Sequence, residues 1–451
     1  MNPKMKKVLI LGAGLVAGPI IKFLLNNGFY VTVASNTPNR AEELINNAPR
    51  GYAISWDAKD KSTLDSLIKE HDITVSLLPY TLHLMVAEKC IVHKKNMVTT
   101  SYVSPEMQAL DAEAKNADII ILNECGLDPG IDHMSAKRII DTVHGFGGKI
   151  LEFYSLCGAL PAPEISNENP FRYKFSWSPK GVILAGNNDA KYMKNGKEKL
   201  TSAENLFKDV FNYSIKGIED LEVYPNRNSL PYINLYNIPE TKTMFRGTIR
   251  YKGWCEIIDT LKTLKLISQD EHDFTGMTYA QMLAKTMNLP NTTNLKQKTA
   301  KFLKFGEGNT AINAMEFLGL FEDIQMNRTK DSTYEIVSDL MIKKMMLGKD
   351  ERDMTILEHI ILAKYPDGKQ EVITSKLLDF GEPGGDTSIA RTVALPAACA
   401  VKMILEDEIL VRGVHIPILP DIYNPIMHEL ENMGIELVEE YGLPLSKTIM
   451  G

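Results

Sequence analysis

The sequence predicts an α/β fold, with a doubly wound parallel sheet in its first part and a mixed α+β region after it. Three observations lead to this prediction. Short apolar runs alternate with helical stretches from Lys7 to about Asp128. A glycine-rich turn follows the first apolar run. After Asp128 the alternation ends, and longer strand-like segments are separated by turns rich in proline and asparagine.

The apolar runs of the first region are short and lack strict two-residue alternation, as expected of strands that helices cover on both faces. These runs are Val8–Leu11, Tyr30–Ala34, Ala53–Ser55, Thr74–Leu78, Met97–Thr100 and Ile119–Leu122. The helical stretches between and after them are Val16–Asn26, Arg40–Asn46, Lys61–Lys69, Ala87–Lys94 and Glu106–Ala117.

The second region reads as a mixed or antiparallel sheet with a helical subdomain. Leucine and methionine recur at helical spacing from about residue 254 to 346. The expected strands are Leu151–Cys157, Leu221–Val223, Thr243–Tyr251, Thr355–Tyr365 and Lys369–Asp379, and Thr387–Leu405 reads as one long helix with an alanine-rich face.

Length and composition restrict the function classes. A chain of 451 residues predicts two or three domains. Its 57 acidic and 50 basic residues give a net charge of -7, which does not supply the basic face that nucleic acid binding needs. The apolar runs are too short to predict a membrane span. The five cysteines are scattered and form no C-x-x-C pair, so we expect a cytoplasmic protein without a metal site. From the charge balance and the short apolar runs, we expect no nucleic acid or membrane partner.

The turn after the first strand is Gly12-Ala13-Gly14-Leu15-Val16-Ala17, a G-x-G-x-x-A form of the Rossmann fingerprint. The first glycine permits the bend, the second lets the backbone approach a pyrophosphate, and the small third residue permits close helix packing. Phosphate oxygens then rest on the free amides of the helix N-terminus. This motif, placed at the first strand-to-helix turn, predicts a dinucleotide site.

The residues after the second strand bear on the choice of dinucleotide. An NAD site usually places an acid there, whereas this chain has Ser35-Asn36-Thr37, followed by Arg40. This pattern favours NADP over NAD, although Arg40 in isolation fits a water-facing residue at a helix start equally well. Further cofactor candidates lie at later strand ends, because ligands bind beyond the carboxyl ends of such strands. They are Leu77, Leu78, Pro79, Thr100 and Ser101.

Seven ordered blocks, together with Gly381-Glu382-Pro383 and the last long helix, extend over essentially the whole chain. The blocks are Ser76–Tyr80, Val98–Tyr102, Gly126–His133, Cys157–Glu164, Tyr173–Ser178, Tyr224–Arg227 and Arg246–Tyr251. Taken together, they resemble the glutamate-forming saccharopine dehydrogenases. Two positions differ from the pattern of the family, since Ala159 replaces an expected glycine and Asn228 an expected aspartate.

The resemblance implies a domain organisation and a reaction. It implies a Rossmann domain at residues 1–128, completed by about 386–451, and a substrate-binding and dimerisation domain at 129–385 with a helical insertion at about 254–346. The implied reaction belongs to lysine metabolism: an NADP- or NAD-dependent interconversion of saccharopine and water with L-glutamate and L-2-aminoadipate 6-semialdehyde. The expected enzyme is a homodimer that acts on a small amino-acid substrate by hydride transfer at an imine.

The resemblance also implies roles for individual residues. Asp128, Tyr102 and Cys157 are expected around the reacting centre, and Leu127 and Asp128 are added to the cofactor contacts. The residues expected to bind substrate are Ser101, Tyr102, Lys174, Arg227, Thr248, Ile249 and Arg250.

The chemistry of the substrate agrees with these roles. Saccharopine has three carboxylates, and arginine grips a carboxylate with two hydrogen bonds, so Arg227 and Arg250 are the main candidate clamps. Asp128 and Tyr102 offer proton transfer at nitrogen or at a carbinolamine oxygen. Asp128 also suits a turn and helix N-cap, Cys157 suits a buried apolar position, and His133 suits a structural histidine better than a base.

Two other functions remain open from the residues. A carboxyspermidine-type dehydrogenase would use the same imine chemistry on a substrate with fewer carboxylates, and would need fewer arginine clamps. A non-enzymatic dinucleotide-binding protein would need no convergence of Tyr102, Asp128 and two arginines.

Overall fold

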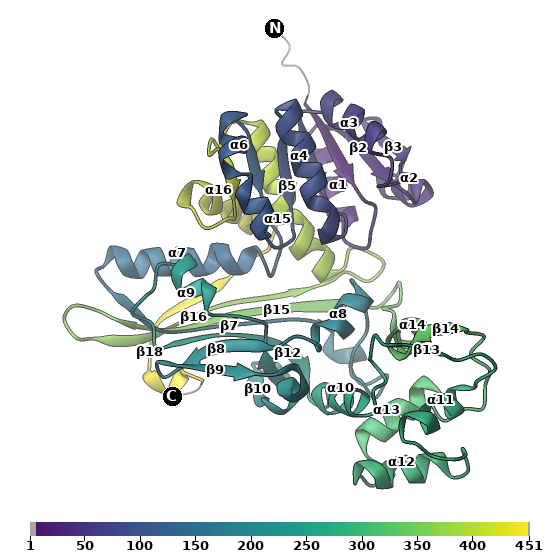
Figure 1. Cartoon of the computed structure of the whole chain (residues 1–451). Helices are drawn as coiled ribbons and strands as arrows, with labels where there is room; N and C mark the ends of the chain where they lie inside the picture. Colours follow the sequence, from purple (N-terminus) through teal and green to yellow (C-terminus); the bar gives the residue numbers. More distant parts are fainter. Residues whose placement is uncertain (1–5, 450–451) are drawn as a thin grey trace. The chain divides into compact units, whose positions relative to one another are not determined.

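The computed structural model describes residues 6–449 (Figure 1). Its internal contacts divide the chain into two compact units. Unit 1 comprises Met1–Leu151, Leu357–Gly381 and Gly385–Gly451, and unit 2 comprises Glu152–Ile356 and Glu382–Gly384.

Unit 1 contains a seven-stranded sheet in the order β17-β6-β5-β4-β1-β2-β3, and all of its strand pairs are parallel. The chain order reverses between β1 and β4, and this switch point is where such sheets bind ligands. The predicted strands of the first region are therefore confirmed. Their bounds are β1 Lys7–Leu11, β2 Tyr30–Ser35, β3 Gly51–Ser55, β4 Ile73–Ser76, β5 Asn96–Thr99, β6 Ile120–Leu122 and β17 Gly413–His415.

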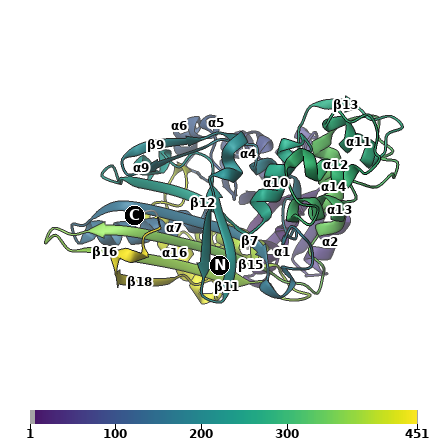
Figure 2. The same ribbon diagram turned by 90° about the horizontal axis from the view of Figure 1, so that it is seen from below.

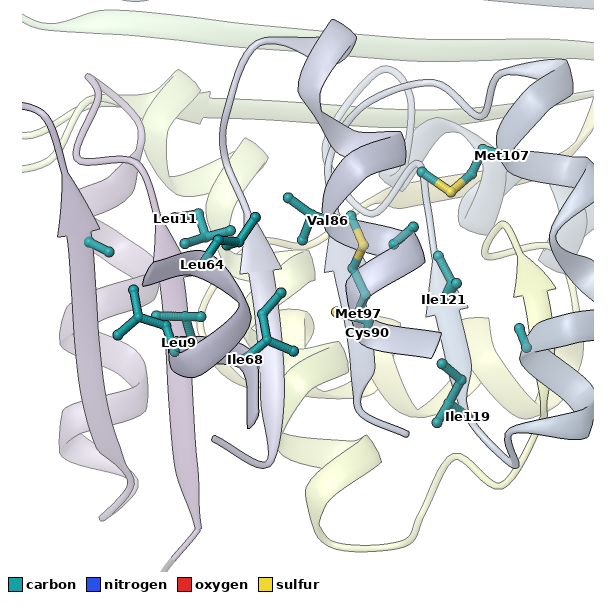
Figure 3. Packing of buried hydrophobic residues seen from close by; sticks show 14 of the residues in the cluster. Leu9, Leu11, Leu64, Ile68, Val86, Cys90, Met97, Met107, Ile119 and Ile121 are labelled. Atoms are coloured by element: carbon teal, nitrogen blue, oxygen red, sulfur yellow. The ribbon is translucent and has the colours of Figure 1, made fainter. Parts of the chain in front are cut away.

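Successive side chains of a strand point to opposite faces of the sheet, so strands that are apolar throughout need helices on both faces. Leu9 and Leu11 of β1 pack on one face with Leu64 and Ile68 of α3 and with Val86 of α4 (Figure 3). The helices of unit 1 in chain order are α1 Ala17–Asn26, α2 Pro38–Ile45, α3 Lys61–Glu70, α4 His83–His93, α5 Pro105–Ala109, α6 Asp111–Asn116, α7 Ile131–Gly145, α15 Ser388–Leu405 and α16 Pro420–Asn432.

The long helix α15 begins where the sequence predicts it, since the Thr387 side chain accepts a hydrogen bond from the Ala390 amide as its N-cap. Within residues 6–449, α15 is the one helix long and apolar enough to cross a membrane by length and composition. However, 83% of that stretch is buried inside the structure, where it packs on α1 and α16. This burial is that of a core helix.

The sheet of unit 2 is mixed, as the sequence predicts. Strand β12 pairs parallel with β7 and antiparallel with β11, and β11 pairs antiparallel with β10. A hairpin of β8 and β9, which the sequence does not predict, adds to β12. The bounds are β7 Lys149–Pro161, β8 Ala190–Lys194, β9 Lys197–Thr201, β10 Phe211–Ile215, β11 Ile218–Pro225 and β12 Thr243–Tyr251, with short helices α8 Pro179–Ala185 and α9 Pro231–Leu235.

The predicted helical insertion is present in unit 2. Figures 1 and 2 both show α10 to α14 gathered at one end of the sheet of this unit. The elements are α10 Trp254–Thr263, β13 Glu271–Asp273, α11 Tyr279–Thr286, α12 Leu295–Leu303, α13 Thr310–Leu318, β14 Lys330–Ser332 and α14 Thr333–Met345. After them, β15 Asp353–Lys364 leads into β16 Gln370–Phe380, which pairs antiparallel with β18 Val438–Leu443 in unit 1.

The contact-based division differs from the predicted domain limits. Unit 1 continues past Asp128 to Leu151, because α7 packs on α16. It also includes β16, which the resemblance assigns to the substrate domain. As a result, the loop before α7, which carries Asp128, lies in the same unit as the dinucleotide turn.

Candidate active site

The turn after β1 has the geometry that a dinucleotide needs. Gly12 has a left-handed φ of +108°, and its amide donates to the Ala34 carbonyl at 2.9 Å. A Cβ at Gly12 would lie 3.1 Å from the Leu77 carbonyl oxygen. Only glycine therefore lets β1 turn this close to the residue that follows β4.

Gly14 meets a different requirement. A Cβ at this position would have no protein atom within 4 Å, so the backbone faces open space. Next to it, α1 has Val16 as N-cap without any side-chain cap hydrogen bond, and Ala17 is fully buried. The open backbone and the uncapped helix N-terminus fit a pyrophosphate, while Leu15 is half exposed beside them.

The end of β2 carries no acid. Ser35 is buried, and its hydroxyl accepts the Thr37 amide at 3.1 Å. Asn36 is exposed. Arg40 lies in the first turn of α2, where its guanidinium is half exposed and donates to Glu43 at 3.0 Å. An exposed ion pair of this kind is weak, so Arg40 stays available for a phosphate.

The ends of β4 and β5 are joined by a buried histidine. His83 lies 2.8 Å from the Ser76 hydroxyl through Nδ1 and 2.8 Å from the Ser101 hydroxyl through Nε2. Burial lowers the pKa of His83 to about 4, so the ring is neutral near pH 7. A neutral ring donates a hydrogen bond from one nitrogen and accepts one at the other. The two hydrogen bonds from Ser76 through His83 to Ser101 therefore run in one direction.

Tyr102 and Asp128, which follow β5 and β6, meet at the same edge of the sheet. The Tyr102 hydroxyl donates to Asp128 Oδ1 at 3.1 Å. Helix α7 has Gly130 as N-cap without a side-chain cap hydrogen bond, and the Gly130 amide donates instead to Asp132. One oxygen of the Asp128 carboxylate is thus directed at the Tyr102 hydroxyl.

In unit 2 the clearest candidate for binding a substrate carboxylate is Arg250 on β12, which is 4% exposed. Its Nη1 donates to the Ile249 carbonyl at 2.8 Å, and its Nε has no hydrogen-bond partner. The guanidinium lies 5.2 Å from the centre of the Tyr173 ring and 5.7 Å from that of Trp254. Among residues 6–449 no carboxylate forms an ion pair with Arg250, although Glu222 of β11 lies opposite it in the sheet.

The other predicted residues of unit 2 differ in their surroundings. Thr248 is paired across the sheet with Cys157 of β7, and both are partly buried, whereas Ile249 is buried. Arg227 is exposed and has a left-handed φ of +52°. Lys174 forms ion pairs with Glu168 and Glu351, which favours a structural role for its ammonium over a substrate contact.

Sequence reasoning missed three residues that the structure places at these edges. His83 joins two strand ends, Glu124 accepts a hydrogen bond from the Val103 amide, and Trp254 faces Arg250. A signal for Glu124 existed, because an acid directly after the buried strand β6 needs a partner.

Two family models match the chain. The saccharopine dehydrogenase NADP binding domain matches residues 8–122, and the saccharopine dehydrogenase C-terminal domain matches residues 126–435. The chain belongs to the saccharopine dehydrogenase family. This confirms the resemblance drawn from the seven blocks, and the first model agrees with the preference for NADP.

Relatives of the saccharopine dehydrogenase family extend over nearly the whole chain. Saccharopine dehydrogenase [NADP(+), L-glutamate-forming] of Pyricularia oryzae is 38% identical over 446 residues, which are 96% of this chain and 99% of that protein. The Saccharomyces cerevisiae protein of the same name is 38% identical over 445 residues, with the same two coverages. The structure of apo saccharopine dehydrogenase (L-Glu forming) from Saccharomyces cerevisiae matches with a TM-score of 0.89 and 37% identity, covering 97% of this chain and 99% of that one. The predicted α/β fold is thereby confirmed.

The two glycines of the turn should respond differently to alanine. Gly12→Ala should destabilise the protein by about 1–3 kcal/mol, because the φ is unfavourable and the Cβ meets Leu77. Gly14→Ala should change stability by less than about 0.5 kcal/mol but weaken NADP binding roughly tenfold, because its Cβ points only into the open space for phosphate. Urea unfolding and fluorescence titration with NADPH measure both. Equal loss of stability in the two variants would contradict this assignment.

His83 should make stability fall with acid. Its folded pKa of about 4 lies below the unfolded value near 6.5, so between these pH values the unfolded chain binds the extra proton. Lowering the pH from 7 to 5 should cost about 2 kcal/mol through this residue. His83→Asn should be less stable at pH 7 yet lose less on acidification in urea unfolding. His71, whose pKa burial also lowers, is present in both proteins and cancels in the comparison. Parallel pH profiles would refute the role of His83.

Proposed function

We propose that the chain catalyses the NADP-dependent interconversion of saccharopine and water with L-glutamate and L-2-aminoadipate 6-semialdehyde. Membership of the family over both domains supports this reaction. The observation that carries the proposal is the buried Arg250 guanidinium, which has a free Nε and forms no ion pair with a protein carboxylate among residues 6–449.

A buried cation without an anion is unfavourable unless a ligand supplies the missing charge. Saccharopine has three carboxylates at physiological pH, and one of them would complete the environment of Arg250 with a charge-assisted pair. The aromatic rings of Tyr173 and Trp254 hold the guanidinium meanwhile through cation–π contacts. Arg227, exposed on the turn after β11, is our candidate for a second carboxylate.

The cofactor site belongs to unit 1. The turn at Gly12 and Gly14 and the N-terminus of α1 would hold the pyrophosphate, and Arg40 would face the 2′-phosphate. The nicotinamide, when bound, would accept or donate a hydride. In the oxidising direction the hydride leaves the saccharopine carbon that becomes the aldehyde, and the C–N bond becomes an imine.

The protein groups then handle protons. Water adds to the imine carbon to give a carbinolamine, whose collapse releases L-glutamate and the semialdehyde. Proton transfer at nitrogen and oxygen needs a donor and an acceptor within hydrogen-bond reach, and we assign these to the Tyr102 hydroxyl and the Asp128 carboxylate. The balance is saccharopine, water and NADP⁺ on one side, and L-glutamate, semialdehyde, NADPH and one proton on the other.

Two further attributes belong to this proposal. We infer a cytoplasmic enzyme, which the scattered, unpaired cysteines support. We also infer a homodimer, which follows from the family resemblance. Size-exclusion chromatography with light scattering tests the dimer.

Purified protein should reduce NADP⁺ with saccharopine at a higher kcat/KM than it reduces NAD⁺, because Ser35-Asn36-Thr37 places no acid against a 2′-phosphate. Absorbance of the reduced nicotinamide measures both reactions. A carboxylated polyamine is the control substrate. Turnover of the polyamine but not of saccharopine would replace the proposal by the carboxyspermidine-type reaction, and turnover of neither in either direction would favour a binding protein.

Binding and chemistry should separate in two variants. Arg250→Lys keeps the buried charge but loses the planar fork, so it should raise the KM for saccharopine roughly tenfold to a hundredfold with kcat little changed. Asp128→Asn should lower kcat by roughly 10²–10⁴-fold and flatten one limb of the pH–rate profile. NADPH binding and melting temperature, measured on both variants, are the controls. An unchanged kcat for Asp128→Asn would remove Asp128 from proton transfer.

A further inference from the structure

One buried carboxylate holds the loop that carries Tyr102. Glu124 follows β6, is 4% exposed and has a left-handed φ of +58°. Its amide donates to the Ser101 carbonyl at 3.0 Å, and its Oε1 accepts the Val103 amide at 2.9 Å. Tyr102 is therefore fastened on both sides by the same glutamate.

The other oxygen of this carboxylate is bound from α7. Glu124 Oε2 lies 2.6 Å from His133 Nε2, and the His133 side chain is fully buried. The first turn of the same helix also holds the loop of Asp128, since the Asp132 amide donates to the Leu127 carbonyl at 3.0 Å. Helix α7 thus connects to both partners of the hydrogen bond between Tyr102 and Asp128.

These features by themselves destabilise the folded protein. A glutamate in the left-handed region is strained, and two buried ionisable side chains lose their hydration. An apolar pair of similar volume usually fills such a space at least as well. The pair instead connects two loops rigidly to helix α7. One of these loops carries Tyr102, which is 37% exposed and would otherwise be free to move.

We propose that Glu124 and His133 are positioning residues that fix the Tyr102 hydroxyl against Asp128 during proton transfer. This inference rests on the proposed function, because it assigns the geometry of the proposed donor and acceptor. Both side chains are buried, and we assign them no contact with substrate or cofactor. The pair acts through Ser101 and Val103, so its effect should pass through Tyr102.

A double-mutant cycle separates this role from a structural one. Glu124→Gln retains the length of the side chain and an acceptor for the Val103 amide, but weakens the contact with His133. It should lower kcat about tenfold to a hundredfold, with the KM for saccharopine changed less than about twofold. In a Tyr102→Phe background the same change should lower kcat by less than about threefold, because the hydroxyl that it positions is gone. Losses that multiply fully in the double variant overturn the proposal.

Ser135 provides a matched control on the same helix. It is fully buried and 2.8 Å from His359, but bonds to neither loop. Ser135→Ala should lower the melting temperature with kcat unchanged. Equal loss of kcat in Ser135→Ala and Glu124→Gln would show that α7 acts only through general stability, and would overturn the proposal.

A readout independent of turnover distinguishes failure of this inference from failure of the proposed function. In a sample with ¹³C-labelled tyrosine, the Cζ resonance of Tyr102 is assigned by its absence in Tyr102→Phe. Glu124→Gln should shift this resonance and alter its pH titration, whereas Ser135→Ala should not. A wild type without saccharopine turnover refutes the function alone, and an unmoved Tyr102 resonance refutes the positioning role alone.

Discussion

Glu124 carries a carboxylate out of water, and such a charge persists only where donors surround it. The Val103 amide and the His133 ring meet its two oxygens, and its own amide closes on Ser101. These contacts join three elements: the loop after β5, the end of β6 and helix α7. This arrangement places Tyr102 and Asp128, because it holds the loop of Tyr102 directly and reaches the loop of Asp128 through helix α7.

The cofactor end of unit 1 depends on a comparable closeness of backbones. The Leu77 amide donates to the Leu11 carbonyl at 2.9 Å, and a Cβ added to Gly12 would lie 3.1 Å from the Leu77 carbonyl oxygen. The strand ends β1, β4 and β5 are therefore in register where His83 links Ser76 to Ser101. A neutral, buried histidine suits this place because it bridges two hydroxyls without the cost of burying a charge.

Much of this was predictable from sequence, for physical reasons. Parallel strands and their helices have strong hydrophobic patterns, and the Gly12 turn has a fixed chemistry, so unit 1 and the residues at its strand ends were foreseen. The hairpin β8–β9 was not, because its two strands are short and rich in lysine and β9 is largely exposed. The contact of Glu124 with His133 depends on the path of the loop between β6 and α7, which no periodicity encodes. Lys174 shows the converse, since its position in a matching block gave no sign of Glu168 and Glu351 beside it.

The charges of the two units complement each other in the proposed reaction. Unit 2 holds Arg250 out of water beside the paired rings of Tyr173 and Trp254, where a carboxylate ligand would gain a strong interaction because little solvent screens it. Unit 1 holds the hydroxyl and the carboxylate to which we assign proton transfer, and both groups remain partly exposed, as exchange with water requires. The proposed substrate has both kinds of group, because saccharopine has carboxylates that an arginine binds and one reacting nitrogen at which protons are exchanged. Its carboxylates stay ionised throughout and serve binding, so the proton transfers at the centre are left to groups that Glu124 and His133 keep in place.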